Sequence, residues 1–261
     1  MFVAIDRKTS QWTPETRAIV KDVQKLRNSS GLAEARTEVV KNIGADIGQF
    51  LQQILSRKPA VEYDILLKIH SKSDGVWLRS QIDGLCGSIS KVEEIFLQFE
   101  DQAKLGMIGP PAMTWNTDTD PLAACCIEAK PDEIAQRDKI QLEFDQFCMC
   151  EHRPCIWLSC RYNDFLYPGE KWIQKTYHDI YPAETLVKEH YRVVVGSAYW
   201  SRYGPLVANE KLRAAASAWL EKMPGHYKAG SRADDDADRV LHSLERVLPT
   251  MVRAHYGLEV I

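Results

Sequence analysis

The chain has 261 residues, 45% of them hydrophobic and 26% charged, which is enough to bury a full core. Its 33 basic and 36 acidic residues nearly balance, so no overall field attracts nucleic acid or an anionic membrane. No apolar run approaches the length of a transmembrane span, and the start MFVAIDRKTS lacks a signal peptide's apolar segment. The seven cysteines, an odd number, do not indicate a disulfide framework. We therefore expect a reduced, cytoplasmic protein that reaches a membrane only through partners.

In the first half of the chain, the sequence predicts alternating strands and helices. Short apolar runs predict strands at residues 2–5, 39–40, 63–69 and 105–109. Apolar residues at helical spacing predict a helix from Ile47 to Leu55. Two further helices are predicted between Trp77 and Phe99, with a break near Gly84–Gly87. Because a strand buried on both faces reads as an apolar run, residues 63–69 are expected to form a central parallel strand. Ligands bind at the carboxyl ends of such strands.

Polar residues gather at these strand ends. The segment from Asn42 through Gly44 to Asp46 predicts a turn, and Asp46 is either the N-cap of the following helix or a ligand contact. His70 and Lys72 share one side of the extended segment that follows the strand. A lysine ammonium can neutralise phosphate charge directly, as a metal ion would. The alternative is a hydrogen-bonded core histidine and a solvated lysine.

The middle of the chain, residues 121–189, is the least regular part and is expected to be a variable insertion. Just before it, Asp118 and Asp120 form an Asp-x-Asp triplet, which is a weaker candidate for a metal site because it follows the wrong strand. The cysteines between Cys148 and Cys160 lack paired C-x-x-C spacing, so we expect them to be reduced and metal-free; a zinc-supported scaffold is the alternative. Aromatic residues such as Tyr177 and Tyr181 suit an acceptor-binding loop, or they are ordinary anchors that hold a long loop in place.

The last part of the chain predicts a strand at residues 192–195, followed by Gly196 and Ser197, where a ligand could approach the backbone closely. Trp200 is expected either to line the binding site beside that ligand or to pack beneath the site as a core residue. A helix is expected at residues 212–223. A final helix carries His242, Glu245 and Arg246 on adjacent turns, and a carboxylate on a helix is either a general base or half of a structural ion pair.

Several of these residues occur in the same order as the motifs of a known family. The pattern consists of Asn42, Gly44, Asp46, Tyr63, Asp64, His70, Ser71, Lys72, Trp77, Arg79, Leu105, Gly106, Gly109 and Pro110, then residues 195–202 (VGSAYWSR) and 241–246 (LHSLER). This pattern resembles the rhamnan synthesis protein F family of glycosyltransferase-like proteins over about two-thirds of the chain. The resemblance implies one α/β domain over residues 1–261, GT-A-like and Rossmann-like, with a mostly parallel sheet flanked by helices.

The implied function is transfer of a sugar, with rhamnose suggested by the family name alone, from a nucleotide-diphosphate donor to a carbohydrate acceptor. The implied transfer is inverting, with Glu245 or Asp238 as base and His242 as positioner. The donor-binding candidates are Asn42, Gly44, Asp46, His70, Ser71, Lys72, Gly196, Ser197, Trp200, Arg202 and Arg246. Participation of Mn²⁺ or Mg²⁺ is left open. The rival interpretation is a non-catalytic glycan- or protein-binding module on the same fold.

Overall fold

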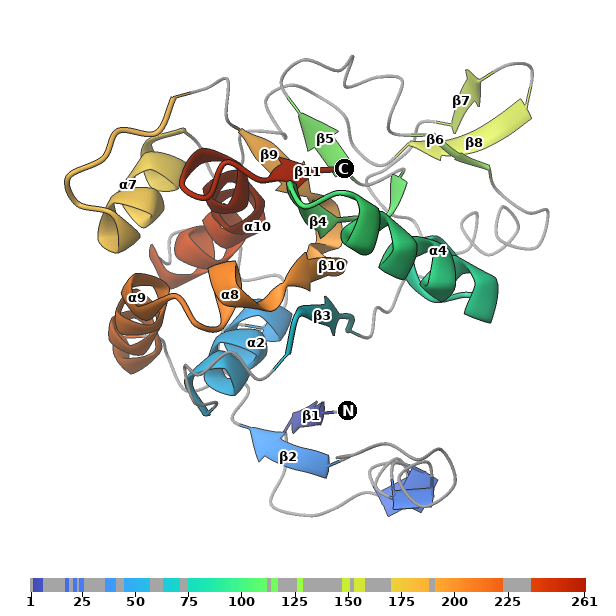
Figure 1. Ribbon diagram of the computed structural model, residues 1–261, viewed down its shortest axis with the longest axis horizontal. Coiled ribbons are helices and arrows are strands. Elements are labelled where there is room, and N and C mark those ends of the chain that lie inside the picture. The colour runs from blue at the N-terminus through green and yellow to red at the C-terminus, as the bar shows by residue number, and fades with distance from the viewer. Residues whose placement is uncertain are drawn as a thin grey trace.

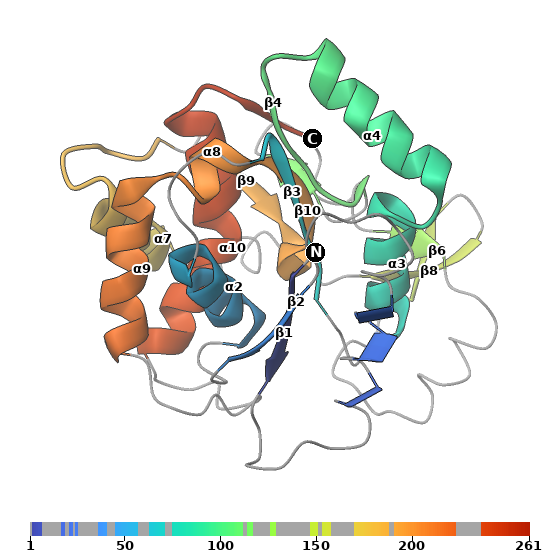
Figure 2. The same ribbon diagram turned by 60° about the horizontal axis from the view of Figure 1, so that its bottom comes forward.

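The computed structural model describes residues 2–6, 17–18, 21–22, 24–25, 36–40, 45–56, 63–70, 75–111, 114–116, 126–128, 147–150, 153–157, 170–187, 191–222 and 236–261. Strands β1, β2, β6, β7 and β8 are described by their backbone and register. The described elements are mixed helix and strand, with helices on both faces of a central sheet (Figure 1; Figure 2). The coarse α/β prediction is therefore confirmed.

The first two strands form a parallel pair. Strand β1 spans Phe2–Asp6 and pairs with β2, Arg36–Val40, with Phe2 opposite Arg36 and Asp6 opposite Val40. Both were predicted from their apolar residues, and β2 is longer than the pattern indicated. Parallel pairing requires a crossover between the two strands.

The central sheet has four strands in the order β11-β4-β10-β3. They span Glu259–Val260 (β11), Leu105–Ile108 (β4), Tyr199–Arg202 (β10) and Ile65–Lys68 (β3). Strand β11 is parallel to β4, whereas β10 runs antiparallel to both of its neighbours. The prediction of a mostly parallel sheet is therefore wrong for this sheet. The strand predicted to be central and parallel at residues 63–69 is β3. It pairs antiparallel with β10 and lies at one end of the order of the four strands.

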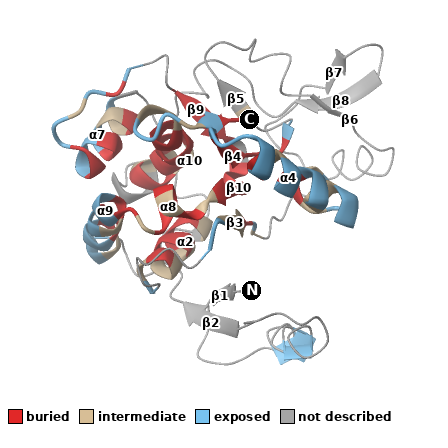
Figure 3. Cartoon of the chain, viewed as in Figure 1, coloured by how far each residue is buried: buried red, intermediate tan, exposed pale blue. Residues whose placement is uncertain are grey.

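One face of the sheet is covered by the larger core cluster. Helix α2 spans Ala45–Ser56, α7 spans Glu170–Ile180, α9 spans Glu210–Lys222 and α10 spans Asp236–Ala254. Their buried residues repeat at helical spacing, as in Leu51 and Ile54 of α2 and Leu244, Val247 and Leu248 of α10. Each fully buried aliphatic side chain stabilises the fold by about 2 kcal/mol. Buried residues concentrate on these helices and the adjoining strands (Figure 3).

The opposite face carries the smaller cluster. Helix α3 spans Gly75–Leu85 and α4 spans Ile89–Asp101. The predicted break near Gly84–Gly87 is confirmed, because Ser88 caps α4 by accepting a hydrogen bond from the Lys91 N–H at 3.1 Å. Ile95 and Phe99 of α4 pack against Leu105 and Trp200 of the sheet. The remaining face of α4 is exposed (Figure 3).

The middle of the chain contributes to both core and periphery. Within the predicted insertion, Tyr177 and Tyr181 are 2% and 1% exposed in the larger cluster, so they are core residues and not parts of an open acceptor loop. A separate antiparallel sheet has the order β6-β8-β7, with β6 at Cys126–Glu128, β7 at Phe147–Cys150 and β8 at Arg153–Trp157.

Short elements precede and follow strand β10 of the central sheet. Strand β9, Arg192–Val194, pairs with β5, Thr114–Asn116, and is followed by a 3₁₀ turn, Val195–Ser197. Helix α8, Tyr203–Leu206, follows β10 directly. Among the helices in the described ranges, none has both the length and the apolar content that a membrane crossing needs.

Candidate functional site

The carboxyl end of β3 brings Lys68 and His70 to the larger-core side of the sheet. Lys68 is the register partner of Tyr199 on β10. Because side chains alternate along a strand, Lys68 and His70 share one side. Lys68 is only 6% exposed, which is unusual for a side chain that carries a full positive charge. Such a cation must be compensated by acceptors around it.

Two acceptors compensate the Lys68 ammonium. Its Nζ donates to Asp46 Oδ2 at 3.0 Å and to the Ser197 carbonyl at 2.6 Å. The same Nζ lies 5.6 Å from the ring centre of Phe50 and 5.9 Å from that of Tyr199, a range in which an aromatic ring attracts a cation. Lys68 is therefore a buried, paired ion that joins three separate segments of the chain.

Asp46 lies in the first turn of α2, where the helix dipole stabilises a negative charge. The helix begins at Ala45, so the carboxylate of Asp46 lies inside the first turn instead of preceding it. Its Oδ2 contacts Lys68 and lies 3.4 Å from His70 Nε2. Asp46 therefore does not act as a simple N-cap, and the ligand contact that the sequence left open as the alternative stays a prediction.

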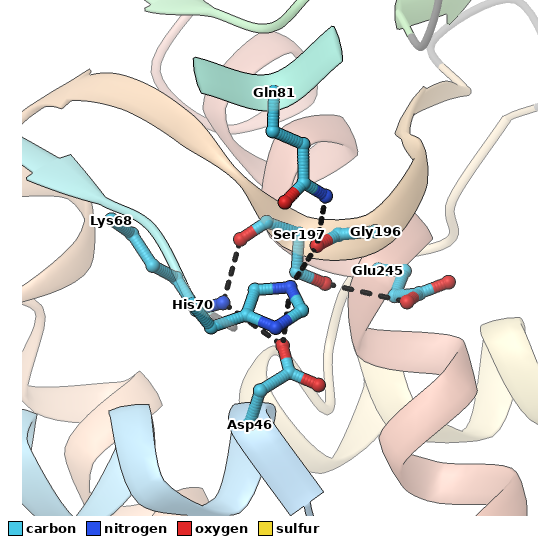
Figure 4. A network of polar contacts seen from close by, with 7 residues as sticks. All are labelled: Asp46, Lys68, His70, Gln81, Gly196, Ser197 and Glu245. Carbon is cyan, nitrogen blue, oxygen red and sulfur yellow. Dashed lines mark hydrogen bonds and ion pairs between the residues drawn. The ribbon is translucent and has the colours of Figure 1, made fainter. Parts of the chain in front are cut away.

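The turn at Gly196 and Ser197 supplies the backbone acceptors of the site. Gly196 has φ 75° and ψ 7°, and Ser197 has φ 52°, so both occupy the left-handed region. Glycine adopts this region freely, whereas a serine there is strained by about 1 kcal/mol. His70 Nε2–H donates to the Gly196 carbonyl, and Gln81 Nε2 donates to the same oxygen at 3.3 Å. With Lys68 on the Ser197 carbonyl, these contacts compensate the strain of the turn (Figure 4).

Helix α10 contributes a carboxylate on the other side of the turn. Ser197 Oγ donates to Glu245 Oε1 at 3.5 Å, a long and weak contact. Glu245 Oε2 accepts from Arg246 NH1 at 2.8 Å, and that same NH1 donates to the His242 carbonyl at 2.9 Å. Figure 4 shows Glu245 facing the turn opposite the β3 side chains. One carboxylate oxygen is thus held firmly by an arginine, and the other is held loosely.

Two buried polar atoms beside this network have no hydrogen-bond partner among the described residues, namely Gln81 Oε1 and the Tyr199 hydroxyl. Burial, and to a smaller extent the negative charge of Asp46, raises the pKa of the Tyr199 hydroxyl above its usual range. The phenol therefore stays neutral. An unsatisfied buried polar atom costs about 1–3 kcal/mol and is ordinarily met by water or a ligand.

Two predicted donor contacts have structural partners elsewhere. Trp200 lies on the opposite face of β10, where its Nε1–H donates to the Leu85 carbonyl at 2.9 Å and its ring meets Phe96 edge-on. Arg202 lies at the far end of β10 and donates to the carbonyls of Leu105, Phe99 and Gln102, at the end of α4 and the start of β4. Neither side chain joins the network around Lys68.

Of the remaining predicted site residues, some lie within the described ranges and others do not. Asn42, Gly44, Ser71, Lys72, Asp118 and Asp120 lie outside the described residues. Asp238 lies on α10 about two turns before Glu245, on the same helical face. His242 takes part in the described contacts through its carbonyl, which Arg246 binds. Among the side chains that the structure describes, no three His, Cys, Asp or Glu residues gather closely enough to hold a metal ion.

Lys68 and Gln81 are site residues that the sequence reasoning missed. Lys68 carried a usable signal, because a lysine within the apolar run ILLKI has the same alternation as His70 and so belongs to its side of the strand. Gln81 carried no comparable signal, since a glutamine on a helix is ordinarily solvated. It is 1% exposed only because α3 packs against the 196–197 turn.

Comparisons with models of known protein families, with curated proteins and with solved structures find no match for this chain.

Proposed function

We propose that this chain is a glycosyltransferase that binds a nucleotide-diphosphate sugar at the carboxyl end of β3 and transfers the sugar to a carbohydrate acceptor. The observation that carries the proposal is the convergence of Asp46, His70, the 196–197 turn and Glu245 around the buried ammonium of Lys68. Asp46, His70, the turn and Glu245 come from α2, the segment directly after β3, the chain before β10 and α10, and each was a candidate on sequence grounds. The order of their motifs resembles the rhamnan synthesis protein F family, which supports a GT-A-like architecture for the whole domain.

The charges of the network indicate what a diphosphate would need. Lys68 is paired with Asp46, and Arg246 is paired with Glu245, so these four ions sum to zero. A diphosphate brings about two negative charges and requires further positive charge in a partly desolvated site. Lys72, two residues after His70 in the sequence and outside the described residues, is the expected source of this charge. We therefore assign Lys72 to the phosphates and Lys68 to the organisation of the site.

Glu245 suits the role of general base in an inverting transfer. Arg246 holds one carboxylate oxygen, which orients the group, while the weak contact with Ser197 leaves the other oxygen exchangeable for an acceptor hydroxyl. Ser197 donates to Glu245 and not to the imidazole, so the contacts favour a carboxylate base over a serine nucleophile activated by histidine. His242 would position Arg246 through its carbonyl.

A panel of nucleotide-diphosphate sugars tests the proposal. Binding is measured by thermal shift and confirmed by calorimetry, each with Mn²⁺, with Mg²⁺ and with chelator. We expect at least one donor to stabilise the protein without a divalent cation, because Lys72 supplies the charge. Lys72→Ala should weaken donor binding by about 1–3 kcal/mol. Lys91→Ala, which changes a half-exposed lysine of α4, is the matched control and should leave donor affinity unchanged.

Two results would contradict the assignment. Equal donor affinity in Lys72→Ala and Lys91→Ala would remove Lys72 from the phosphate site. Stabilisation that appears only with Mn²⁺ or Mg²⁺ would show that a metal ion, and not the lysine, neutralises the phosphates.

A non-catalytic glycan- or protein-binding module is the second candidate, favoured by one observation: the contacts of Lys68 with Asp46 and with the Ser197 carbonyl also hold α2, β3 and the 196–197 turn together. The two functions differ in turnover. A module of this kind binds sugar without consuming any donor, whereas the enzyme releases a nucleoside diphosphate in the presence of acceptor.

A further inference from the structure

Helix α4 is buried on one side only, and its other side carries large apolar side chains. Ile95 and Phe99 belong to the smaller core cluster, whereas Ile89, Leu97 and Phe96 are 80%, 55% and 41% exposed (Figure 3). Within the described ranges, the other large hydrophobic side chains that are exposed lie outside helices and strands. Single exposed apolar residues are ordinary on a surface, but a group of them on one helix indicates an interaction face.

The three exposed side chains form a strip along α4. Ile89 and Phe96 are seven residues apart, nearly two full turns, so they share one face. Leu97 is rotated from Phe96 by about 100° around the helix axis and widens the strip. The ring of Phe96 meets that of Trp200 edge-on at 5.3 Å between ring centres, and Ser88 caps the start of the helix. The strip is therefore held in place before any partner binds, which lowers the entropic cost of binding.

Carboxylates surround this strip. Glu93 and Glu100 are exposed and lie one turn after the first two apolar residues of the strip, on the same face of the helix. Glu94 and Asp101 are exposed beside it. Over the whole of α4, four carboxylates stand against one ammonium, that of Lys91, which leaves a formal charge of −3. The face is therefore both apolar and acidic.

The charge distinguishes between the possible occupants of this face. A second copy of the chain would set one face of charge −3 against another, and like charges across an interface oppose association. The headgroups of an anionic membrane would be repelled in the same way. A cationic partner gains from both features, because its basic side chains reach the carboxylates while its apolar side chains cover the strip.

We propose that the exposed face of α4 binds an amphipathic helix of a partner protein, rich in lysine or arginine. The apolar residues of the partner recur at helical spacing, so that they lie along Ile89, Phe96 and Leu97. Its basic residues flank that stripe and pair with Glu93 and Glu100. Helix α4 and Lys68 lie on opposite faces of the central sheet, so this face is separate from the proposed donor site.

Synthetic peptides test the proposal on the full chain. The first is a fluorescently labelled peptide of about 18 residues, long enough to form a helix, with leucine at the a and d positions of each heptad and lysine at e and g. A second peptide has glutamate in place of lysine, and a third has the composition of the first in scrambled order. Binding is followed by fluorescence anisotropy. We expect the lysine peptide to bind more tightly than either of the others, and added salt to weaken its binding.

Substitutions in α4 separate the apolar and the charged contributions. Leu97→Gln keeps a good helix former but removes an exposed apolar side chain, so it should weaken binding of the lysine peptide by about tenfold or more. Glu93→Lys combined with Glu100→Lys should reverse the preference, so that the glutamate peptide binds more tightly than the lysine peptide. Val187→Gln changes an exposed apolar residue after α7 and should leave the affinity unchanged. The melting temperature of each variant shows whether it is folded.

Several results would overturn the proposal. No binding, or equal affinity for the lysine, glutamate and scrambled peptides, would show that the face does not select a basic amphipathic helix. An equal loss of affinity in Leu97→Gln and Val187→Gln would place the binding elsewhere. A dimer in analytical ultracentrifugation that Leu97→Gln converts to a monomer would assign the face to a second copy of the chain. Adsorption to vesicles of anionic lipid that Leu97→Gln abolishes would assign it to a membrane surface.

Discussion

Lys68 depends on its two acceptors to keep a charge inside the protein. Replacing it with methionine retains most of the apolar stem but leaves the Asp46 carboxylate without its 3.0 Å partner. Breaking a buried pair in this way costs several kcal/mol, because the remaining charge is poorly solvated. We expect Lys68→Met to lower the free energy of unfolding by about 3 kcal/mol, measured by urea denaturation.

The exposed pair between Lys91 and Glu94, 2.8 Å apart on α4, is the matched control for this substitution. Lys91→Met should change the unfolding free energy by less than about 1 kcal/mol, because solvent screens the pair. Adding Asp46→Asn to Lys68→Met should recover part of the loss, since it removes the carboxylate that has lost its ammonium partner. A loss in Lys68→Met no greater than in Lys91→Met would show that Lys68 is not a buried ion in solution.

Glu245 distinguishes catalysis from structural pairing. Glutamine keeps an oxygen for Arg246 NH1 but cannot accept a proton, so Glu245→Gln should reduce turnover by about a hundredfold or more. Donor affinity and the melting temperature should remain nearly those of the unchanged protein. A structural ion pair predicts the reverse, a lower melting temperature with activity lost only through unfolding. If transfer continues undiminished in Glu245→Gln, the base lies elsewhere and Asp238 is the next residue to test.

At the scale of elements, β4 packs so closely that one of its positions has no room for a side chain. A Cβ at Gly106 would lie 2.5 Å from Leu258 Cβ and 2.5 Å from Val252 Cγ1. Leu258 directly precedes β11, and Val252 belongs to α10. We expect Gly106→Ala to push these elements apart and to cost about 1–3 kcal/mol of unfolding free energy. Gly204→Ala on α8 is the control, because a Cβ there meets nothing within 4 Å. It should be neutral or slightly stabilising, since alanine favours a helix over glycine. Equal destabilisation of the two variants would contradict the close packing of β4.

At the scale of the whole molecule, the two core clusters differ in how firmly they hold their helices. Helix α10 buries Leu244, Val247 and Leu248 at 1% exposure or less, whereas α4 buries Ile95 and Phe99 and exposes its other face. We therefore expect α4 to open at a lower free energy than α10 in hydrogen exchange measured by mass spectrometry. Phe99→Ala should speed exchange in α4 with little change in α10. Identical opening free energies for the two helices would mean that the clusters unfold only together.

The sequence by itself determined most of the elements and several of the site residues. The spacing of Ile47, Phe50 and Leu51 predicted the helix α2 and the face that it buries, because helical periodicity is a local property of the chain. The glycines near residue 84 predicted the break between α3 and α4 for the same reason. Asp46, His70, Gly196–Ser197 and Glu245 were candidates before the fold was known, and the structure brings them into contact with one another or with Lys68. Their role in sugar transfer stays a prediction.

Only the tertiary structure decided which strands pair and in which direction. Strand β10 inserts between β3 and β4 and runs antiparallel to both, although it follows β4 by some ninety residues in the chain. An apolar run specifies that a strand is buried but carries no record of its neighbour, because pairing is a contact between distant segments. The register of β10 on β3 places the 196–197 turn beside Lys68 and so makes that lysine the centre of the network. The register of β7 on β8 likewise sets Cys148 opposite Cys155, a proximity that their spacing along the chain could not indicate.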